Sequence, residues 1–280
     1  VDEGNGGYRV DADYYAIGLP IEAMRELLTP ALERAAPSLG GVRELDTAWM
    51  NGIMFYLDRA TQFAQGHISY FDSPWALTTI SQHQFWEEYD ISDLDGVEGI
   101  LSVVISDWNR PGIVYDKPAK ECSPDQVKDE VLAQLEGHLN DDDDIRLTDE
   151  LIADWFLDPA VQYEPERGES TNSESLLINT VGSLQYRPEA ATEAANLVIA
   201  TDYVRTNTDL ATMEAANEAA RRAVNAIIER SGSSADPCRV MSVSIPPALG
   251  LLRRLDAHLY QRQLSHPGAL TPVAWNAYTN

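Results

Sequence analysis

Residues 196–228 constrain the fold of this chain more than any other stretch. The segment begins with the apolar run Leu197–Ala200, which predicts a short buried strand that ends near Asp202. A polar loop follows, and a long alanine-rich helix is predicted from about Thr212. This order places a helix amino terminus beside an acid, which suits a phosphate-bearing or partly anionic cofactor. The alternative is a tightly packed structural helix, for which alanines are equally typical.

The composition excludes whole classes of partner. The 280 residues include 45 acidic and 20 basic side chains, so the formal net charge is -25. A surface this acidic repels nucleic acid, which is therefore not an expected partner. No apolar run approaches the ~20 residues of a membrane-spanning helix, so a soluble protein is expected. The polar, glycine-rich opening is not typical of a secretory signal, so the expected location is cytoplasmic.

The basic residues include only three lysines. An acidic, lysine-poor surface is typical of proteins adapted to high salt, where carboxylates hold water and cations while their mutual repulsion is screened. The alternative is an ordinary acidic protein. Either interpretation concerns the solvent and says little about the chemistry.

The sequence contains no motif for a metal site or a catalytic triad. The run Asp141–Asp144 lacks the alternating ligand spacing of a calcium loop, so a solvated surface loop is predicted. Cys122 and Cys238 lie far apart and outside any CxxC pair, so reduced thiols are expected. The histidines are scattered along the chain, and no bound metal is expected.

The first half of the chain predicts a strand, a helix and then a sheet. Residues 14–17 are typical of a strand, and apolar side chains recur at helical spacing over residues 20–36. β-Branched and aromatic residues predict strands of an antiparallel sheet at residues 50–57, 67–71 and 76–86. Residues 100–108 are apolar on both faces, which predicts a central strand.

The second half predicts further helices and one strand. Ser123, Pro124 and Gln126 form a capping-box pattern that opens a helix extending to Leu139. The other predicted elements are a short helix at 148–156, a polar excursion at 163–175, a strand at 176–181, a linker at 231–234 and a helix at 245–263. The last helix could dock on the protein, lie against a membrane surface or bind a partner subunit.

Aromatic residues are concentrated in the predicted sheet, and they allow two interpretations. Tyr56, Phe71 and Trp75 could form the wall of a long apolar substrate pocket. The same rings could instead make the hydrophobic core, because large rings bury apolar area efficiently.

Two short motifs in the opening segment carry a family resemblance. Thr201-Asp202 and Met213-Glu214-Ala215-Ala216 resemble the C-terminal FAD-binding motif of the flavin-containing amine oxidase and phytoene desaturase superfamily. In that motif a strand runs into Gly-Asp, and a later Met-Glu-Gly-Ala opens the last flavin-facing helix. Thr201 and Ala215 replace its two glycines, and each adds a Cβ. Residues 73–86 and 176–183 are similar to the desaturase-like members, so the resemblance spans most of residues 10–230.

The resemblance implies a fold and a domain organisation. The fold is expected to be α/β (α+β), with an antiparallel or mixed substrate-domain sheet, helices, and the C-terminal part of a Rossmann-like FAD domain. The implied divisions are a βα unit at 1–36, a substrate-binding domain at 37–175, an FAD-binding segment at 176–230, and a linker with a final helix at 231–280. The Gly-x-Gly-x-x-Gly turn of the dinucleotide-binding half does not occur in the sequence. We therefore expect a C-terminal portion that by itself binds FAD weakly or not at all.

The resemblance also assigns cofactor-binding residues. Asp202 would accept hydrogen bonds from the ribityl or pyrophosphate region of FAD. Backbone amides of Thr212, Met213 and Glu214 would face the flavin pyrimidine edge, where they favour the negative charge that develops on reduction. The remaining implied contacts are Tyr203 and Ala216. Arg187 is a candidate to face the cofactor or a neighbouring acid, and the alternative is a structural arginine.

The function implied by the resemblance is flavin-dependent dehydrogenation of a hydrophobic substrate, with an isoprenoid or carotenoid precursor placed ahead of an amine. No catalytic acid or base is assigned, because hydride abstraction by flavin does not require one. Two alternatives are a non-catalytic module that binds an apolar ligand and a truncated product without independent function. The expected partners are a hydrophobic small molecule and weak peripheral contact with a membrane.

Overall fold

The computed structural model describes residues 10–264, apart from 62, 89–90, 92–93, 95, 142 and 243–245. The α-helices are α1 (Ile21–Leu27), α2 (Pro30–Ala35), α3 (Pro124–Leu139), α4 (Met213–Ser231) and α5 (Gly250–Gln261). The short 3-10 helices are η1 (Pro37–Glu44), η2 (Gln82–Phe85), η4 (Ala119–Glu121), η5 (Asp149–Leu151), η6 (Ser183–Tyr186) and η7 (Pro247–Leu249). The strands are β1 (Tyr15–Ile17), β2 (Asp46–Ala48), β3 (Gly52–Leu57), β4 (His67–Ser69), β5 (Thr78–Ile80), β6 (Gly99–Val104), β7 (Ile152–Leu157), β8 (Val161–Glu164), β9 (Glu169–Asn172), β10 (Leu176–Ile178) and β11 (Leu197–Ile199). The prediction of a mixed α/β protein is confirmed.

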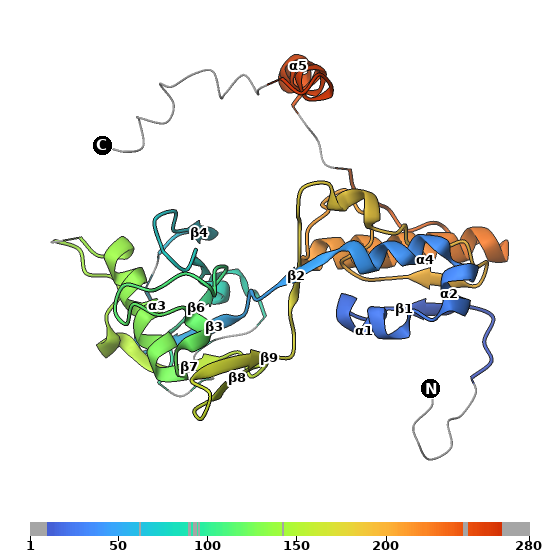
Figure 1. Ribbon diagram of the computed structural model, residues 1–280. Coiled ribbons are helices and arrows are strands. Elements are labelled where there is room, and N and C mark those ends of the chain that lie inside the picture. Colours follow the sequence, from blue (N-terminus) through green and yellow to red (C-terminus); the bar gives the residue numbers. More distant parts are fainter. Residues whose placement is uncertain are drawn as a thin grey trace.

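Two clusters of buried apolar side chains organise the described chain. The first, here the terminal core, joins residues 21–45 to residues 177–226. The second, here the sheet core, lies within residues 53–161. Figure 1 shows the corresponding parts, with β2 running between them. The terminal core is therefore built from segments that are far apart in the sequence.

The chain crosses between the two cores at a pair of antiparallel strands. β2 leaves the terminal core and pairs with β10, which returns to it. The Thr180 hydroxyl donates to Asp46 Oδ2 over 2.9 Å just beyond the paired residues. Because Leu39 and Val42 in η1 pack in the terminal core, the first crossing lies at β2.

A five-stranded antiparallel sheet forms the sheet core, in the order β4-β5-β6-β3-β7. β6 is the middle strand, which confirms the prediction of a central strand at this position. Val131 and Leu135 of α3 pack with Phe55 and Leu101 in this core. Burial alternates along β3, so Met54 and Tyr56 lie on the opposite face. We call that opposite side the open face of the sheet.

The terminal core contains a parallel pair of strands and a long helix. β1 pairs in parallel with β11, in the register Ala16 with Val198. Ala219 and Ala223 of α4 are buried in the same core as all three residues of β11. Small side chains at these positions let the helix backbone approach the strand closely. The predicted order of a buried strand, a loop and an alanine-rich helix is confirmed.

Three predicted elements were wrong. The helix predicted over residues 20–36 is divided into α1 and α2, because Pro30 has no amide hydrogen and Thr29 caps a new helix at Leu32 N. The strand predicted over residues 76–86 ends at Ile80 and is followed by η2. The helix predicted over residues 148–156 is mostly β7, whose Trp155 and Phe156 favour a strand at the sheet edge.

The polar excursion predicted at residues 163–175 is in fact a hairpin made of β8 and β9. Asn172 Nδ2 donates to Asn51 Oδ1 over 2.6 Å, and Asn51 Nδ2 donates to Asp158 Oδ2 over 3.0 Å. Asn51 is buried beside β3, so these long-range bonds hold the polar hairpin against the sheet. Short-range sequence patterns do not reveal such contacts.

The remaining local predictions have mixed outcomes. Gln126 N donates to Ser123 Oγ over 3.3 Å and Ser123 N donates to Gln126 Oε1 over 3.1 Å, so the capping box of α3 is confirmed. Both cysteines are free thiols, and burial raises the pKa of Cys122 to about 11. Among the described residues no group of side chains could hold a metal ion. Asp142 lies outside the described residues.

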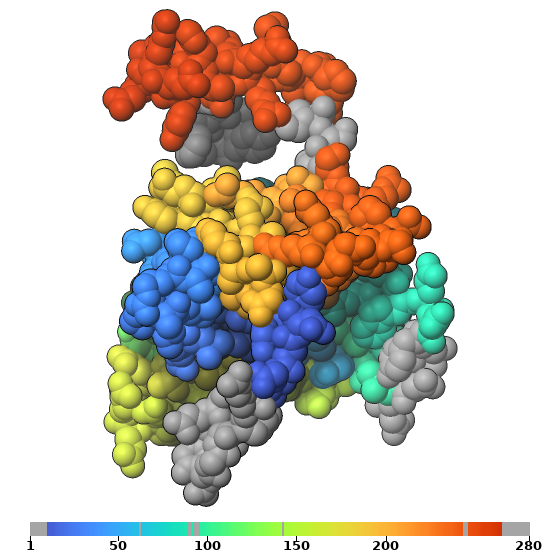
Figure 2. All heavy atoms as spheres, turned by 90° about the vertical axis from the view of Figure 1, so that its right-hand side faces the viewer, coloured from blue at the N-terminus to red at the C-terminus, as the bar shows by residue number. Residues whose placement is uncertain are grey.

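The final helix, α5, has no buried residue. In Figures 1 and 2 it stands apart from both cores. Within the part of the chain that the structure describes, no helix has the length and apolarity to cross a bilayer. Whether α5 docks on the protein, contacts a membrane or binds a subunit stays a prediction.

A fully buried carboxylate fixes the loop before α3. Glu130 accepts hydrogen bonds from the amides of Ile113, Val114 and Tyr115 and from Gln134 Nε2. These four donors satisfy a charge that would otherwise be costly to bury.

We expect Gly112→Ala to lower the free energy of unfolding by about 1–3 kcal/mol, because the added Cβ would overlap the Glu130 carboxyl group. Denaturant unfolding measures the change. The control is Gly137→Ala in α3, where a Cβ meets nothing within 4 Å and should raise stability by up to about 1 kcal/mol. Equal effects of the two substitutions would contradict this view of the loop.

Candidate functional site at the end of β11

The candidate site is built where β11 ends and α4 begins. All three residues of β11 are buried, and Thr201 and Asp202 follow directly at its carboxyl end. The predicted start of α4 near Thr212 is confirmed, and Thr212 is the N-cap, because its Oγ1 accepts a hydrogen bond from Ala215 N over 3.2 Å. The intervening loop is tied to the helix by Asn207 N, which donates to Glu218 Oε1 over 2.9 Å. The strand end, the loop and the first turns of α4 therefore form one connected unit.

The first turn of α4 contains backbone N–H groups that are free to bind a ligand. Thr212 satisfies the amides of Ala215 and Ala216, the latter through its carbonyl oxygen at 3.0 Å. The Thr212 amide, which was expected to face the flavin with those of Met213 and Glu214, donates to the Leu210 carbonyl over 3.0 Å. The amides of Met213 and Glu214 have no hydrogen-bond partner among the described residues. The Met213 side chain is 85% exposed, so this end of the helix is open. Unpaired N–H groups and the helix dipole together favour a negatively charged group here.

Asp202 supplies an acid at the other side of the unit. Its Oδ1 accepts from the Thr201 hydroxyl over 3.2 Å, and its backbone carbonyl accepts from Arg187 Nη1 over 3.1 Å. Within the described chain, Asp202 Oδ2 has no hydrogen-bond partner. The carboxylate is partly exposed and can accept from a hydroxyl group of a ligand.

Tyr203 carries an unpaired polar atom beside this acid. The side chain is 0% exposed, and its hydroxyl has no hydrogen-bond partner among the described residues. Burial and then the neighbouring Asp202 charge raise the pKa of the Tyr203 phenol, so the group stays neutral. A buried hydroxyl without a partner is uncommon and costs stability. Its position next to Asp202 is consistent with a partner supplied by a ligand.

The two residues that replace glycines do not crowd the open side of this unit. Ala215 is fully buried, so its methyl group adds no bulk to the exposed surface of α4. Thr201 is almost fully buried, and its hydroxyl is engaged by Asp202. The donors and acceptors present therefore fit a flavin cofactor, with Asp202 and the two free amides as the groups that would hold it.

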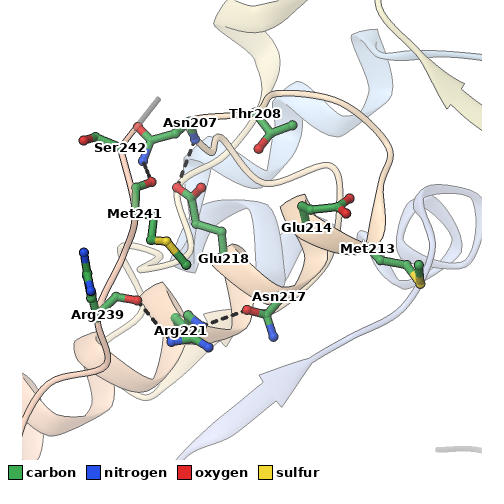
Figure 3. Close-up of a pocket in the computed structure, with 10 residues that line it drawn as sticks. All are labelled: Asn207, Thr208, Met213, Glu214, Asn217, Glu218, Arg221, Arg239, Met241 and Ser242. Carbon is green, nitrogen blue, oxygen red and sulfur yellow. Dashed lines mark hydrogen bonds between the residues drawn. The ribbon is translucent and has the colours of Figure 1, made fainter. Parts of the chain in front are cut away.

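A cavity of about 540 Å³ opens over the first turns of α4. Figure 3 shows Met213, Glu214 and Asn217 on the helix side and Met241 on the opposite wall. Asp202, Tyr203, Thr212 and Ala216 do not line it. Of the predicted cofactor residues, the cavity thus brings together only Met213 and Glu214.

No sequence pattern indicates the opposite wall, which comes from residues after α4. Asn225 holds Cys238 through both backbone groups, accepting from its amide over 2.7 Å and donating to its carbonyl over 2.9 Å. Asn207 Nδ2 then donates to the Met241 carbonyl over 2.7 Å (Figure 3). Side-chain bonds to backbone at such separations leave no periodic signal in a sequence.

The three predicted substrate residues do not lie together. Tyr56 lines a cavity of about 770 Å³ on the open face, with Met54, Phe85, Trp86 and Ile100. Phe71 is 96% exposed in the turn between β4 and β5. Trp75 is 0% exposed in the sheet core, where its Nε1 donates to the Arg110 carbonyl over 3.0 Å.

Some lining residues of this cavity could have been found from the sequence. Met54 and Tyr56 are two positions apart on one strand and therefore share a face. Ile100 pairs with Tyr56 across β3 and β6. Identifying Ile100 required the register of the two strands, which the sequence does not contain.

The sequence matches a known protein family. The family model of flavin containing amine oxidoreductases matches residues 2–228. The chain belongs to this family. The matched range includes β11, Asp202 and the first turns of α4, and it implies a flavin cofactor and a flavin-dependent oxidoreductase. A search of curated proteins finds no match.

We expect Tyr203→Phe to raise the free energy of unfolding of the flavin-free amine oxidoreductase chain by about 1 kcal/mol, because it removes a buried hydroxyl that has no partner. The matched control is Tyr70→Phe, which removes a buried hydroxyl paired with Thr79 Oγ1 at 2.9 Å and should lower stability by a similar amount. Denaturant unfolding of both variants measures the difference. A loss of stability in Tyr203→Phe would show that this hydroxyl is already satisfied.

Proposed function

We propose that the cofactor is FAD and that the reaction is dehydrogenation or desaturation of a hydrophobic substrate, of the isoprenoid or carotenoid-precursor class. One observation carries this proposal. Asp202 and the open amino end of α4 occur in the same short segment of a chain that belongs to a flavin family. The apolar cavity on the open face supports the substrate class.

Each part of the site has a defined task in this proposal. Bound flavin supplies the hydride acceptor. Asp202 would accept hydrogen bonds from ribityl hydroxyl groups of the cofactor, and the amides of Met213 and Glu214 would donate to its flavin ring. Helix-end donors of this kind stabilise nearby negative charge by about 0.3–2 kcal/mol, which favours the reduced cofactor.

The substrate side of the proposal rests on the cavity that contains Tyr56. Met54, Tyr56 and Ile100 present apolar surface from adjacent strands, and Phe85 and Trp86 extend it. Moving a hydrocarbon chain from water onto such a surface lowers the free energy by roughly 25 cal/mol per Å² of apolar area that is buried. A long apolar molecule fits this lining.

A second candidate is oxidation of an amine. Glu87 and Glu88 are exposed and also line this cavity, where two carboxylates would attract a cationic group. An amine with an apolar tail would use both features. The neutral hydrocarbon remains the first proposal, because most of the residues that line the cavity are apolar or aromatic.

For the cofactor, we expect Asp202→Ala to weaken FAD binding at least about tenfold, equivalent to about 1.4 kcal/mol, while the fold survives. FAD titration in high salt, followed by flavin absorbance and fluorescence, measures the affinity. The control is Asp107→Ala, which also removes a partly exposed acid, but one that accepts from the amides of Asn109 and Arg110 next to the sheet core.

Two results would contradict the cofactor proposal. Unchanged affinity in Asp202→Ala would mean that the acid does not contact FAD. Absence of flavin uptake by the unsubstituted protein in any salt would refute an FAD site in this chain.

For the substrate, we expect Tyr56→Asp to weaken binding of diphenylhexatriene, a neutral fluorescent polyene, at least about tenfold, because it places a charge in the cavity. Phe71→Asp is the control, since Phe71 lies outside the cavity. The trimethylammonium derivative of diphenylhexatriene tests the amine alternative. Tighter binding of that cation, lost in a Glu87→Gln, Glu88→Gln double variant, would favour an amine over a hydrocarbon.

A further inference from the structure

The loop between β11 and α4 is held at two carbonyl groups by a continuous hydrogen-bonded bridge. Arg187 Nη1 donates to the Asp202 carbonyl over 3.1 Å, and Arg187 Nη2 donates to Asn179 Oδ1 over 2.6 Å. Asn179 Nδ2 in turn donates to the Asp209 carbonyl over 2.7 Å. The two side chains therefore connect both ends of the segment 202–209.

Burial constrains the arginine half of this bridge, whereas Asn179 is exposed. Arg187 is 3% exposed, although arginine is rarely buried without partners. Burial lowers the pKa of Arg187, while the charges of Asp209 and Asp202 raise it. Arginine stays protonated in proteins, so the guanidinium remains a cation between two acids. Its planar donors can satisfy the carbonyl and the amide oxygen in a fixed direction.

The far end of the bridge holds a constrained turn. Asp209 has φ +50, in the left-handed region that side chains rarely adopt. Thr206 and Asp209 exchange hydrogen bonds, from Thr206 N to Asp209 Oδ1 at 2.9 Å and from Asp209 N to Thr206 Oγ1 at 3.0 Å. This turn lies three residues before the N-cap Thr212. The turn therefore leads directly into the amino end of α4.

The bridge is anchored at the crossing between the two cores. Asn179 follows β10 directly, and its neighbour Thr180 donates to Asp46 at the start of β2. The position of the loop that precedes α4 is thus fixed relative to the strands that connect the terminal core with the sheet core.

We propose that Arg187 and Asn179 are positioning residues that fix the segment 202–209 and thereby aim Asp202 and the amino end of α4 at the flavin. Neither side chain is required to touch the cofactor. The proposal deepens the proposed function and rests on it for the identity of the ligand. The alternative is an ordinary buried arginine whose loss only lowers global stability.

Two substitutions test the hydrogen bonds of the bridge separately. Arg187→Met removes both donors of the guanidinium. Asn179→Asp keeps an acceptor for Arg187 but cannot donate to the Asp209 carbonyl. It therefore tests the bond to Asp209 while Arg187 remains in place. The control is Arg25→Met, because Arg25 also binds two backbone carbonyls in the same core, those of Val42 and Leu45, and within the described chain neither bond reaches the segment 202–209.

The first measurement is amide hydrogen exchange in the flavin-free chain. We expect exchange in residues 203–209 to accelerate at least about tenfold in Arg187→Met and Asn179→Asp, with residues 219–226 of α4 unchanged. Arg25→Met should leave residues 203–209 as in the unsubstituted protein. Unchanged exchange there in both bridge variants would overturn the proposal.

The second measurement is the flavin itself. FAD affinity should fall at least about tenfold in the two bridge variants, and the absorbance spectrum and midpoint potential of the bound flavin should shift, whereas Arg25→Met keeps all three. Accelerated loop exchange with unaltered affinity, spectrum and potential would overturn the positioning role. If the unsubstituted chain takes up no FAD, the proposed function fails, but the exchange experiment still decides whether the bridge fixes the loop.

Discussion

The close packing of α4 on β11 is the interaction on which the rest of the structure depends. Ala219 and Ala223 let the helix lie against the buried strand. The helix is also fixed near both ends, because Glu218 holds the amide of Asn207 and Arg230 Nη2 donates to the Thr192 carbonyl over 2.6 Å. These contacts leave little freedom in where α4 begins. A site that relies on free amides at a helix end needs such a fixed position.

The two cores divide the proposed tasks between them. The terminal core supports the groups that suit a flavin, and the sheet core presents an apolar cavity on its open face. The chain crosses between them at β2 and β10 (Figure 1). In Figure 2 the blue N-terminal segments lie beside the gold and orange segments that lead into and include α4. Membership in the flavin containing amine oxidoreductase family is consistent with this division.

Elements with strong local signals could be predicted from the sequence. The capping box of α3, the apolar β6 and the order of β11 and α4 each depend on residues only a few positions apart. Pro30 was also visible, but the continuous apolar spacing on both sides of it favoured one helix over two. The local pattern of the β7 residues predicts a helix, and it misses the strand because β7 obtains its stability from pairing with β3.

Local sequence patterns also predict only part of the candidate site. Asp202 and the amino end of α4 could be placed by their spacing in one short segment. The substrate residues could not, because burial decides that Trp75 packs in the sheet core and that Phe71 stays exposed. The Arg187–Asn179 bridge joins backbone and side-chain atoms from separate segments, so only the folded chain reveals it.

The most direct test of an FAD site at the end of β11 is backbone amide NMR of the chain during addition of FAD. The account predicts that the amides of Met213 and Glu214 shift most, together with those of residues 201–203, while amides of β5 and β6 stay in place. Shifts confined to the sheet, or no saturable shift at Met213 and Glu214, would contradict the assignment of the cofactor site.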